Sequence, residues 1–431
     1  MKELIRDKLS EATTRSVPVF TRRDVRVPEV PGKAYAVVGA RRAGKTTYLW
    51  QVLEERLRSG APRQALVFLC FEDERLIGLK AMDLHLFVEE YYRIYPEFRG
   101  QKRVVFFLDE IQVVEGWELF VRRLLDSEKV EIFLSGSSAK LLSREVATSM
   151  RGRALEMRIY PFSFREYLRH LEREPSSSFD RLSREERSRI ERDLRDYLVR
   201  GGFPESIGLS FYDHVELLRS YVDVAVLRDV IDRHSVSHPV ALRWLVRQLL
   251  GNPAGRFSVN RFYRDLRSQG IAVAKGTLHE YLGYLEDAFL VRPISIFAHS
   301  ERARMVNPRK VYPVDMGIIP VYSRRPNVGH SLETCIALEL ERRGAEIFYV
   351  KTRSGYEVDF FARFPSGEEM LIQVCTDLYE PSVQEREIRA LIEAQGEFPQ
   401  ATLKLLALEV PLRLEVPPGV EVETVSRWLL S

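Results

Sequence analysis

The residue types best suited to chemistry stand in one short stretch that reads GARRAGKT, from Gly39 to Thr46. An apolar run, residues 34–38, precedes it, and a helical pattern of apolar residues follows it. Strand, GxxxxGKT and helix in that order form the phosphate-binding loop of nucleotide hydrolases. Glycines let the backbone curl so that N–H groups point at an anion, and the helix start adds the positive end of its dipole. We therefore expect a phosphate site made by Gly39, Ala40, Arg41, Arg42, Ala43, Gly44, Lys45, Thr46 and Thr47.

A second stretch, residues 103–110, is a run of apolar residues that ends in Asp109 and Glu110. Five apolar residues in succession indicate a central parallel strand that is covered on both faces. We expect Lys45 to reach the β- and γ-phosphates, and Thr46 and Asp109 to hold Mg²⁺. Glu110 is then the base that polarises the attacking water. The two stretches together predict a site for ATP or GTP.

Composition sets broad limits on the chain. Its 431 residues are enough for two to four domains. Three cysteines lie far apart without CxxC spacing, which favours a reducing, cytoplasmic setting over a disulfide framework or zinc site. The start is too charged for a signal peptide, and no stretch approaches the roughly eighteen apolar residues of a membrane span. A net charge of +3 does not by itself argue for nucleic acid, and 53 of the 65 basic residues are Arg, so a single Arg does not stand out.

The alternation of strands and helices up to residue 159 predicts a parallel sheet with its ligand at the carboxyl ends of the strands. A strand at 131–134 ends in the turn 135–138, beside the phosphate loop if the strand order is that of additional-strand NTPases. A polar side chain there can sense the γ-phosphate or orient the water, and Ser137 is our candidate. The alternative is an ordinary strand-to-helix turn with a Ser cap.

Arg151 and Arg153 stand just before the last strand of this region, residues 154–159. Either could reach the γ-phosphate bound by a neighbouring subunit, and phosphoryl transfer gains much from such an arginine. Because the whole chain is rich in Arg, a surface basic turn is the competing interpretation.

The combination resembles a family of archaeal and bacterial AAA-type ATPases that join an ATPase core to a winged helix and a restriction-endonuclease-like C-terminal domain. The resemblance covers nearly the whole chain. It implies ATP rather than GTP, puts Ser137 at the first sensor, and makes Arg153 or Arg151 similar to the finger residue. The segments that carry it are GARRAGKTT, FFLDEIQ, LSGSSAKLLS, RGRA with YPFSFREYL, GGFPE at 201–205 and NPRKVYPVD at 307–315.

We therefore predict an α/β protein with a P-loop NTPase (AAA-type) parallel sheet core, a helical lid, a winged helix and a restriction-endonuclease-like α/β domain. The third helix of the winged helix is expected to open at a capping box, Thr277 to Glu280. The predicted boundaries are 1–162 for the core, 163–235 for the lid, 236–300 for the winged helix and 301–431 for the last domain.

DNA contact by the winged helix is an open question. From Pro239 to Arg292 there are eight Lys or Arg against four Asp or Glu, but the third helix carries acidic residues and no Lys or Arg beyond its entry. Direct base readout usually needs Arg, Lys, Asn or Gln, so a packing module is an equal alternative. Arginines on the second helix could instead hold phosphates without reading sequence: Arg261, Arg264 and Arg267.

The last domain resembles a restriction-endonuclease-like nuclease whose metal site lacks some of the residues that active members have. In active members of the fold a helix Glu, a strand Asp and an E-x-K pair gather metal ions and activate water. Glu333 and Asp359 match, but the E-x-K position reads Gln373-Val-Cys375. The site would retain two carboxylates of three and lose its Lys. We expect an inert platform for DNA or protein, with any residual cleavage dependent on Asp359.

The sequence thus predicts an Mg²⁺-dependent ATPase, a homo-oligomer with ATP near a subunit interface, in which hydrolysis moves the lid. Its catalytic residues are Glu110, Lys45, Ser137 and Arg153. DNA is the first candidate partner, in repair, recombination or mobile-element control. The first alternative is a nucleotide-driven switch or scaffold that binds protein, and the second is an ATP-regulated nuclease.

Overall fold

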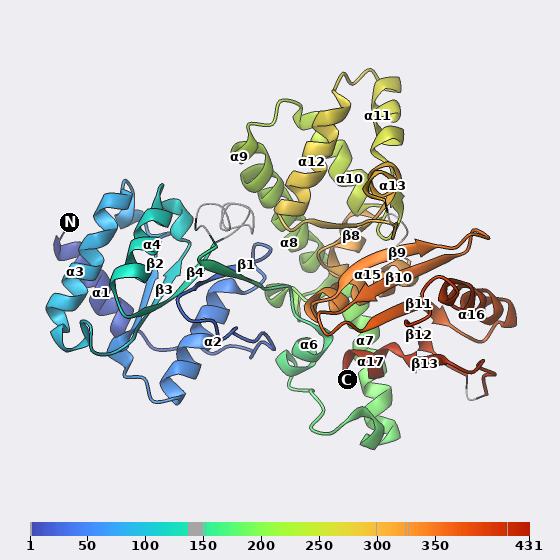
Figure 1. Ribbon diagram of the computed structural model, residues 1–431, viewed down its shortest axis with the longest axis horizontal. Helices are drawn as coiled ribbons and strands as arrows, with labels where there is room; N and C mark the ends of the chain where they lie inside the picture. Colours follow the sequence, from blue (N-terminus) through green and yellow to red (C-terminus); the bar gives the residue numbers. More distant parts are fainter. Residues whose placement is uncertain are drawn as a thin grey trace. The chain divides into compact units, whose positions relative to one another are not determined.

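A computed structural model describes residues 2–136, 150, 152–298, 300–323, 325, 327–411 and 413–431. The chain forms two compact units, residues 1–160 and 161–431, each with its own sheet structure (Figure 1). In the part of the chain that is described, no helix is both long and apolar enough to cross a membrane.

The first unit is built on five parallel strands in the spatial order β2-β3-β4-β1-β5, which confirms the predicted parallel sheet. Strand β4 lies between β3 and β1, so the order is that of additional-strand NTPases. The strands are β1 (Ala34–Val38), β2 (Leu66–Cys70), β3 (Val104–Asp109), β4 (Val130–Ser135) and β5 (Ala154–Arg158). The helices are α1 (Lys2–Thr14), α2 (Lys45–Arg58), α3 (Leu84–Ile94) and α4 (Trp117–Ser127).

A row of aromatic rings crosses this sheet and aligns its central strands. Tyr35, Phe133, Phe107 and Phe68 are paired residue to residue on β1, β4, β3 and β2. Their ring centroids are separated by 4.9, 5.2 and 6.0 Å in turn, and Trp50 of α2 stacks on Phe68 at 4.0 Å. Such contacts favour one register over a slip. They therefore hold the carboxyl ends of β1, β3 and β4 at a common edge.

The second unit begins with helices, in agreement with the predicted helical character of residues 163–235. Ser163 and Ser183 form capping boxes with Glu166 and Glu186, so two of these helices start where their sequences indicate. The helical elements are α6 (Phe164–His170), α7 (Arg184–Arg200), α8 (Phe211–Val224), the π-helical η9 (Ala225–Ile231) and α9 (Asp232–His234).

Three further helices and a small antiparallel sheet, β6-β8-β7, follow. The capping box expected at Thr277 is wrong: α12 begins at Lys275, and its extended N-cap is Ala274. A cap must have extended backbone, whereas Thr277 already lies in the first turn. The assignment to a winged helix stays a prediction. The elements are α10 (Pro239–Leu250), β6 (Arg256–Phe257), α11 (Val259–Ser268), α12 (Lys275–Asp287), β7 (Val291–Ile294) and β8 (Arg309–Pro313).

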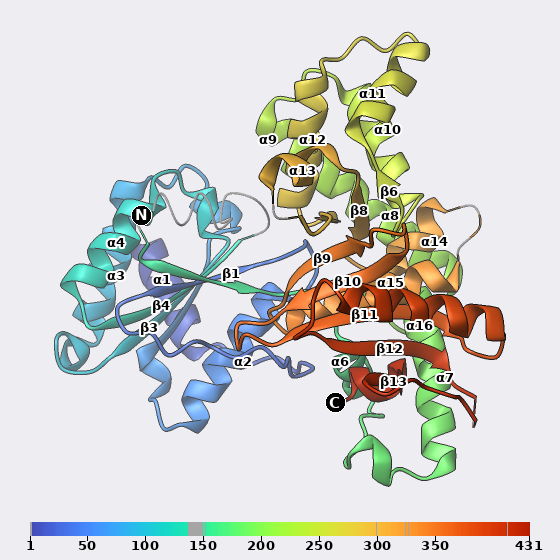
Figure 2. The ribbon, with the colours of Figure 1, turned by 45° about the vertical axis from the view of Figure 1, so that its right-hand side comes forward.

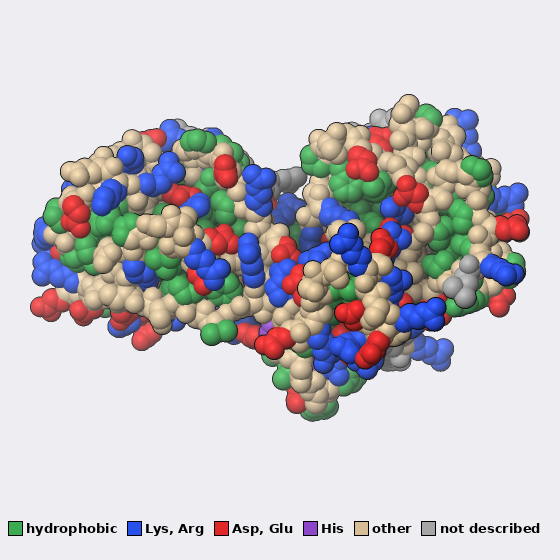
Figure 3. Space-filling model, turned by 90° about the horizontal axis from the view of Figure 1, so that it is seen from below, with side chains coloured by type: hydrophobic (Ala, Val, Ile, Leu, Met, Phe, Trp, Pro, Cys, Tyr) green, Lys and Arg blue, Asp and Glu red, His purple; other side chains and the backbone are tan. Residues whose placement is uncertain are grey.

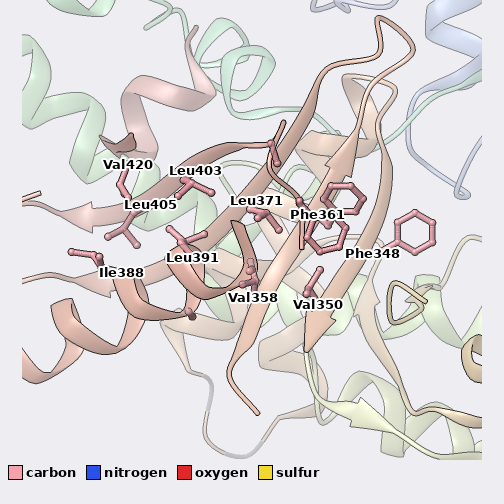
Figure 4. Packing of buried hydrophobic residues seen from close by; sticks show 14 of the residues in the cluster. Phe348, Val350, Val358, Phe361, Leu371, Ile388, Leu391, Leu403, Leu405 and Val420 are labelled. Atoms are coloured by element: carbon pink, nitrogen blue, oxygen red, sulfur yellow. The ribbon is translucent and has the colours of Figure 1, made fainter. Parts of the chain in front are cut away.

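The C-terminal part has a mixed sheet in the order β13-β12-β11-β10-β9. Helix α16 lies along one face of it (Figure 2). Leu391 and Ile388 of α16 point at Leu371, Leu403 and Leu405 of the strands, and all five are buried (Figure 4). The elements are α13 (Glu301–Val306), α14 (Ile319–Tyr322), α15 (Val328–Arg342), β9 (Glu346–Lys351), β10 (Glu357–Arg363), β11 (Glu369–Asp377), α16 (Pro381–Gln395), β12 (Thr402–Glu409), β13 (Val420–Thr424) and α17 (Val425–Leu429).

Two of the sequence motifs, GGFPE and NPRKVYPVD, meet at one buried carboxylate. Asp315 accepts hydrogen bonds from the backbone N–H groups of Gly202 at 2.8 Å and Gly317 at 2.9 Å. Burial raises the pKa of Asp315 to about 7. Gly201 has φ of +71°, and a Cβ there would lie 1.7 Å from Asp315 Oδ1. The glycine is therefore required both by backbone conformation and by the close approach of Asp315.

Candidate nucleotide site

The loop between β1 and α2 can form only with glycine at two positions. Gly39 has φ of +151°, and a Cβ there would lie 2.0 Å from the carbonyl oxygen of Ile159. Gly44, the N-cap of α2, is in the left-handed region with φ of +98°. Arg42 also has a positive φ, 65°. The backbone therefore curls tightly before the helix begins, as the GxxxxGKT spacing predicts.

Lys45 is buried and folds back over this loop. Its Nζ donates to the carbonyl oxygens of Gly39 at 3.1 Å and Ala40 at 2.9 Å. These two carbonyl oxygens are neutral, so an anionic phosphate would be a stronger partner for the same ammonium. Lys45 is also the first residue of α2, where unsatisfied N–H groups and the helix dipole favour an anion.

Asp109 and Thr46 come together at the carboxyl ends of β3 and the start of α2. The Thr46 hydroxyl lies 3.1 Å from both carboxylate oxygens of Asp109. The Ser135 hydroxyl, at the end of β4, donates to Asp109 Oδ1. Burial raises the pKa of Asp109, and the hydrogen bond from Ser135 opposes this rise. The structure therefore presents a buried carboxylate whose hydrogen-bond partners, among the described residues, are neutral hydroxyls.

Glu110 leaves the strand through a left-handed turn, with φ of 54°. Its backbone N–H donates to Ser135 Oγ at 3.2 Å, and its carboxylate accepts a hydrogen bond from the Gln112 side chain. A non-glycine residue at positive φ is uncommon and is concentrated at functional sites. The turn therefore lies directly after Asp109, the last residue of β3.

Two of the predicted site residues, Ser137 and the alternative Arg151, lie outside the described residues. Arg153 is described and forms an ion pair with Asp126; Arg153 is half-buried and Asp126 is exposed. Arg41 and Thr47 are half-buried, whereas Arg42 and Thr46 are exposed. The sensor assignment of Ser137 and the finger assignment of Arg153 stay predictions.

Sequence reasoning missed Ser135 and Arg23. Ser135 could have been found, because it is the polar residue at the carboxyl end of the strand between β1 and β3. Arg23 lies in irregular chain before β1, where no sequence pattern marks it. It is buried, and its guanidinium donates to the Ala43 carbonyl at 2.8 Å and to the Tyr160 carbonyl. Arg23 thus braces the phosphate loop from behind.

A second carboxylate cluster lies in the C-terminal part, and it contains a Lys that does not come from the E-x-K position. Lys310 of β8 donates to Glu333 of α15 at 2.7 Å and to Asp359 of β10 at 2.9 Å. Cys375 does not supply a charge, because burial raises the pKa of its thiol to about 12. The Lys is absent from β11, yet a Lys from a distant strand contacts both carboxylates.

The parallel sheet order and the glycine-bounded loop after β1 define the first unit as a P-loop core of the AAA type. A family profile described as an AAA domain (AAA_14) matches residues 31–168. A second profile, a domain of unknown function (DUF8612), matches residues 191–327.

Relatives match along most of the chain. The uncharacterised protein MJ1544 of Methanocaldococcus jannaschii is 34% identical over 399 residues, which are 91% of this chain and 85% of that protein. The chain therefore belongs to the same family as MJ1544. An uncharacterised protein of Haemophilus influenzae is 28% identical over 92% of this chain and 94% of its own length. Among solved structures, the Walker-type ATPase PABY2304 of Pyrococcus abyssi aligns over 75% of this chain and 95% of that chain, with a TM-score of 0.44 and 14% identity.

Proposed function

We propose that this protein binds and hydrolyses ATP with the help of Mg²⁺. The observation that carries the proposal is the buried Asp109 carboxylate, which contacts Thr46 and Ser135 hydroxyls beside the phosphate loop. Carboxylate and hydroxyl oxygens suit a hard divalent cation, and a buried carboxylate with neutral partners gains from one. Thr46 and Asp109 would hold the ion. When bound, Mg²⁺ supplies positive charge that offsets the negative charge of the phosphates.

The remaining residues are assigned to binding and proton transfer. Lys45 would exchange its two carbonyl partners for phosphate oxygens. Glu110 would accept the proton of the attacking water, with its carboxylate oriented by Gln112. Steady-state ATP turnover tests this proposal. Turnover that requires Mg²⁺ and is lost in Lys45→Ala supports it, and turnover that survives the substitution contradicts it.

Hydrolysis at a subunit boundary is the second part of the proposal. Arg153 is 41% exposed, and its described ion-pair partner, Asp126, is 59% exposed. An exposed ion pair of this kind contributes little to stability, so Arg153 can exchange Asp126 for a phosphate of a neighbouring copy at small cost. This would make the protein a homo-oligomer with an arginine that acts in trans.

DNA is the partner that we favour, with a protein partner as the alternative. Arg261, Arg264 and Arg267 of α11 are exposed. Figure 3 shows both signs of charge intermixed over one face, so DNA binding is not attributed to a general positive field on that face. Contacts from α11 would instead hold phosphates.

DNA affinity measured against salt concentration separates the two partners. A variant with all three α11 arginines changed to Gln is compared with a control that changes Arg184, Arg189 and Arg192 of α7, which are also exposed. We expect weaker binding and a shallower salt dependence in the α11 variant alone. Absence of DNA binding at low salt would favour a protein-directed switch.

A further inference from the structure

The ammonium of Lys310 is enclosed by three carboxylates. Its Nζ lies 2.7 Å from Glu333 Oε1, 2.9 Å from Asp359 Oδ1 and 2.9 Å from Glu357 Oε1. The Lys310 side chain is 4% exposed. An ammonium has three N–H donors, and each has one carboxylate within charge-assisted hydrogen-bond distance.

Three separate elements meet at this ammonium. Lys310 and Tyr312 stand two residues apart on β8, so they share one face of that strand, and the Tyr312 hydroxyl donates to Glu333 Oε1 at 2.6 Å. Glu333 comes from α15, and Glu357 and Asp359 share one face of β10. Arg256, the partner of Lys310 across β6 and β8, forms an ion pair with Glu357. The cluster therefore holds three carboxylates against two resident cations.

The positions that would complete a metal site are occupied by other contacts. The Gln373 side chain accepts from the Asp359 backbone N–H at 3.2 Å and donates to Glu387 at 2.5 Å. The second oxygen of Asp359 accepts from the Val374 backbone N–H at 3.1 Å. Asp359 is thus bonded on one oxygen by the Lys310 ammonium and on the other by backbone.

We propose that Lys310 is the resident cation of this cluster: its ammonium takes the place of a divalent metal between Glu333 and Asp359 and keeps such a metal out. A divalent ion needs oxygen ligands at about 2.0–2.6 Å, and an ammonium at the centre of the same three carboxylates excludes it by space and by charge. The carboxylate cluster of the C-terminal domain is then occupied by Lys310 of the same chain, and the domain does not act as a metal-dependent nuclease.

The ionisation of the cluster agrees with this arrangement. Burial alone would lower the pKa of Lys310, but the charges of Asp359 and Glu333 outweigh it and raise the pKa. Burial, followed by the charge of Asp359, raises the pKa of Glu333 above its ordinary value. His330 of α15 faces the same ammonium, and its pKa is lowered by burial and then by the Lys310 charge. Lys310 therefore remains charged across the physiological range.

Mn²⁺ titration of the full chain without nucleotide tests the proposal. Lys310→Met removes the charge but keeps an unbranched side chain. The matched control is Lys404→Met, because Lys404 also lies between two carboxylates, Glu421 at 3.1 Å and Glu423 at 3.3 Å. We expect Lys310→Met to gain about one Mn²⁺ per chain at least ~10-fold tighter than any binding by the wild type or the control. Adding Asp359→Asn to Lys310→Met should abolish the gain.

Two outcomes would overturn the proposal. The first is Mn²⁺ binding by the wild type that Asp359→Asn removes, because Lys310 would then coexist with a metal at the same carboxylate. This comparison of the wild type with Asp359→Asn tests the proposal even if Lys310→Met fails to fold. The second is a folded Lys310→Met, judged by circular dichroism and retained ATP turnover, that gains no Mn²⁺ site.

Discussion

The two carboxylate clusters of this protein use the same residue types and differ in their counter-charge. Asp109 is buried among hydroxyl donors, Thr46 and Ser135. Asp359 shares the Lys310 ammonium with Glu333 and Glu357. The first cluster has no cation of the chain hydrogen-bonded to its carboxylate among the described residues, whereas the second already holds Lys310 between its carboxylates. Acidic residues at a strand end are therefore not enough to predict a metal, because a cation of the chain can take its place between the carboxylates.

The largest expected effect concerns the first cluster. Lys45→Ala removes the ammonium that would move from the loop carbonyls to the phosphates, so we expect ATP turnover to fall at least ~1,000-fold. Steady-state phosphate release measures it. Lys310→Met is the control from the second cluster and should keep turnover within about twofold, whereas equal losses in both variants would end the distinction between the clusters.

Glu110→Gln should separate binding from hydrolysis. The amide cannot accept the proton of the attacking water, so turnover should fall by about 100- to 1,000-fold while ATP affinity stays within a few fold. Equilibrium binding and single-turnover hydrolysis measure the two quantities. If affinity and hydrolysis fell together, Glu110 would be a binding residue instead of the base.

Lys310→Met should destabilise the second unit, because three carboxylates lose the buried ammonium that they share. We expect a loss of about 3 kcal/mol in the free energy of unfolding. Calorimetry of the full chain can follow the transition of that unit. Lys404→Met should cost less, about 1 kcal/mol, because Lys404 has only two carboxylate partners and one of them, Glu421, is 61% exposed. Similar costs for the two variants would show that the Lys310 cluster is no more tightly coupled than the Lys404 pairs.

Arg153→Ala should lower turnover at least ~10-fold without preventing ATP binding. Mixing Arg153→Ala subunits with Glu110→Gln subunits tests whether the arginine acts in trans. A site that combines an intact Glu110 with the neighbour's Arg153 should recover activity. No recovery in a mixed oligomer would place the arginine in its own subunit's site or outside the mechanism.

The smallest effect should be a gain in stability. Burial raises the pKa of Asp109, so the folded chain holds a proton there more tightly than the unfolded chain. The folded state is consequently destabilised as the pH rises from the pKa of Asp109 in the unfolded chain, about 4, through its higher pKa in the folded chain. Asp109→Asn should therefore stabilise the nucleotide-free protein by about 1 kcal/mol at pH 8 and by little below pH 4. Denaturant unfolding at both pH values measures it, and destabilisation at pH 8 would contradict this account of Asp109.

The sequence predicted what depends on local pattern and missed what depends on distant partners. The phosphate loop and the Asp109 strand have characteristic spacing, and the alternation of strands and helices predicted the sheet. Lys310 could not be recognised, because 49 residues separate it from Asp359 and the two side chains meet only in the folded chain. Arg23 was missed for a similar reason: it lies in irregular chain and acts on backbone carbonyls, which leave no mark in the sequence.

The most direct test compares one carboxylate from each cluster in the same assay. Mg²⁺-dependent ATP turnover is measured for the wild type, Asp109→Asn and Asp359→Asn. We expect turnover in the wild type, its loss in Asp109→Asn and an unchanged rate in Asp359→Asn. Absence of turnover in the wild type, or equal losses in the two variants, would contradict this expectation.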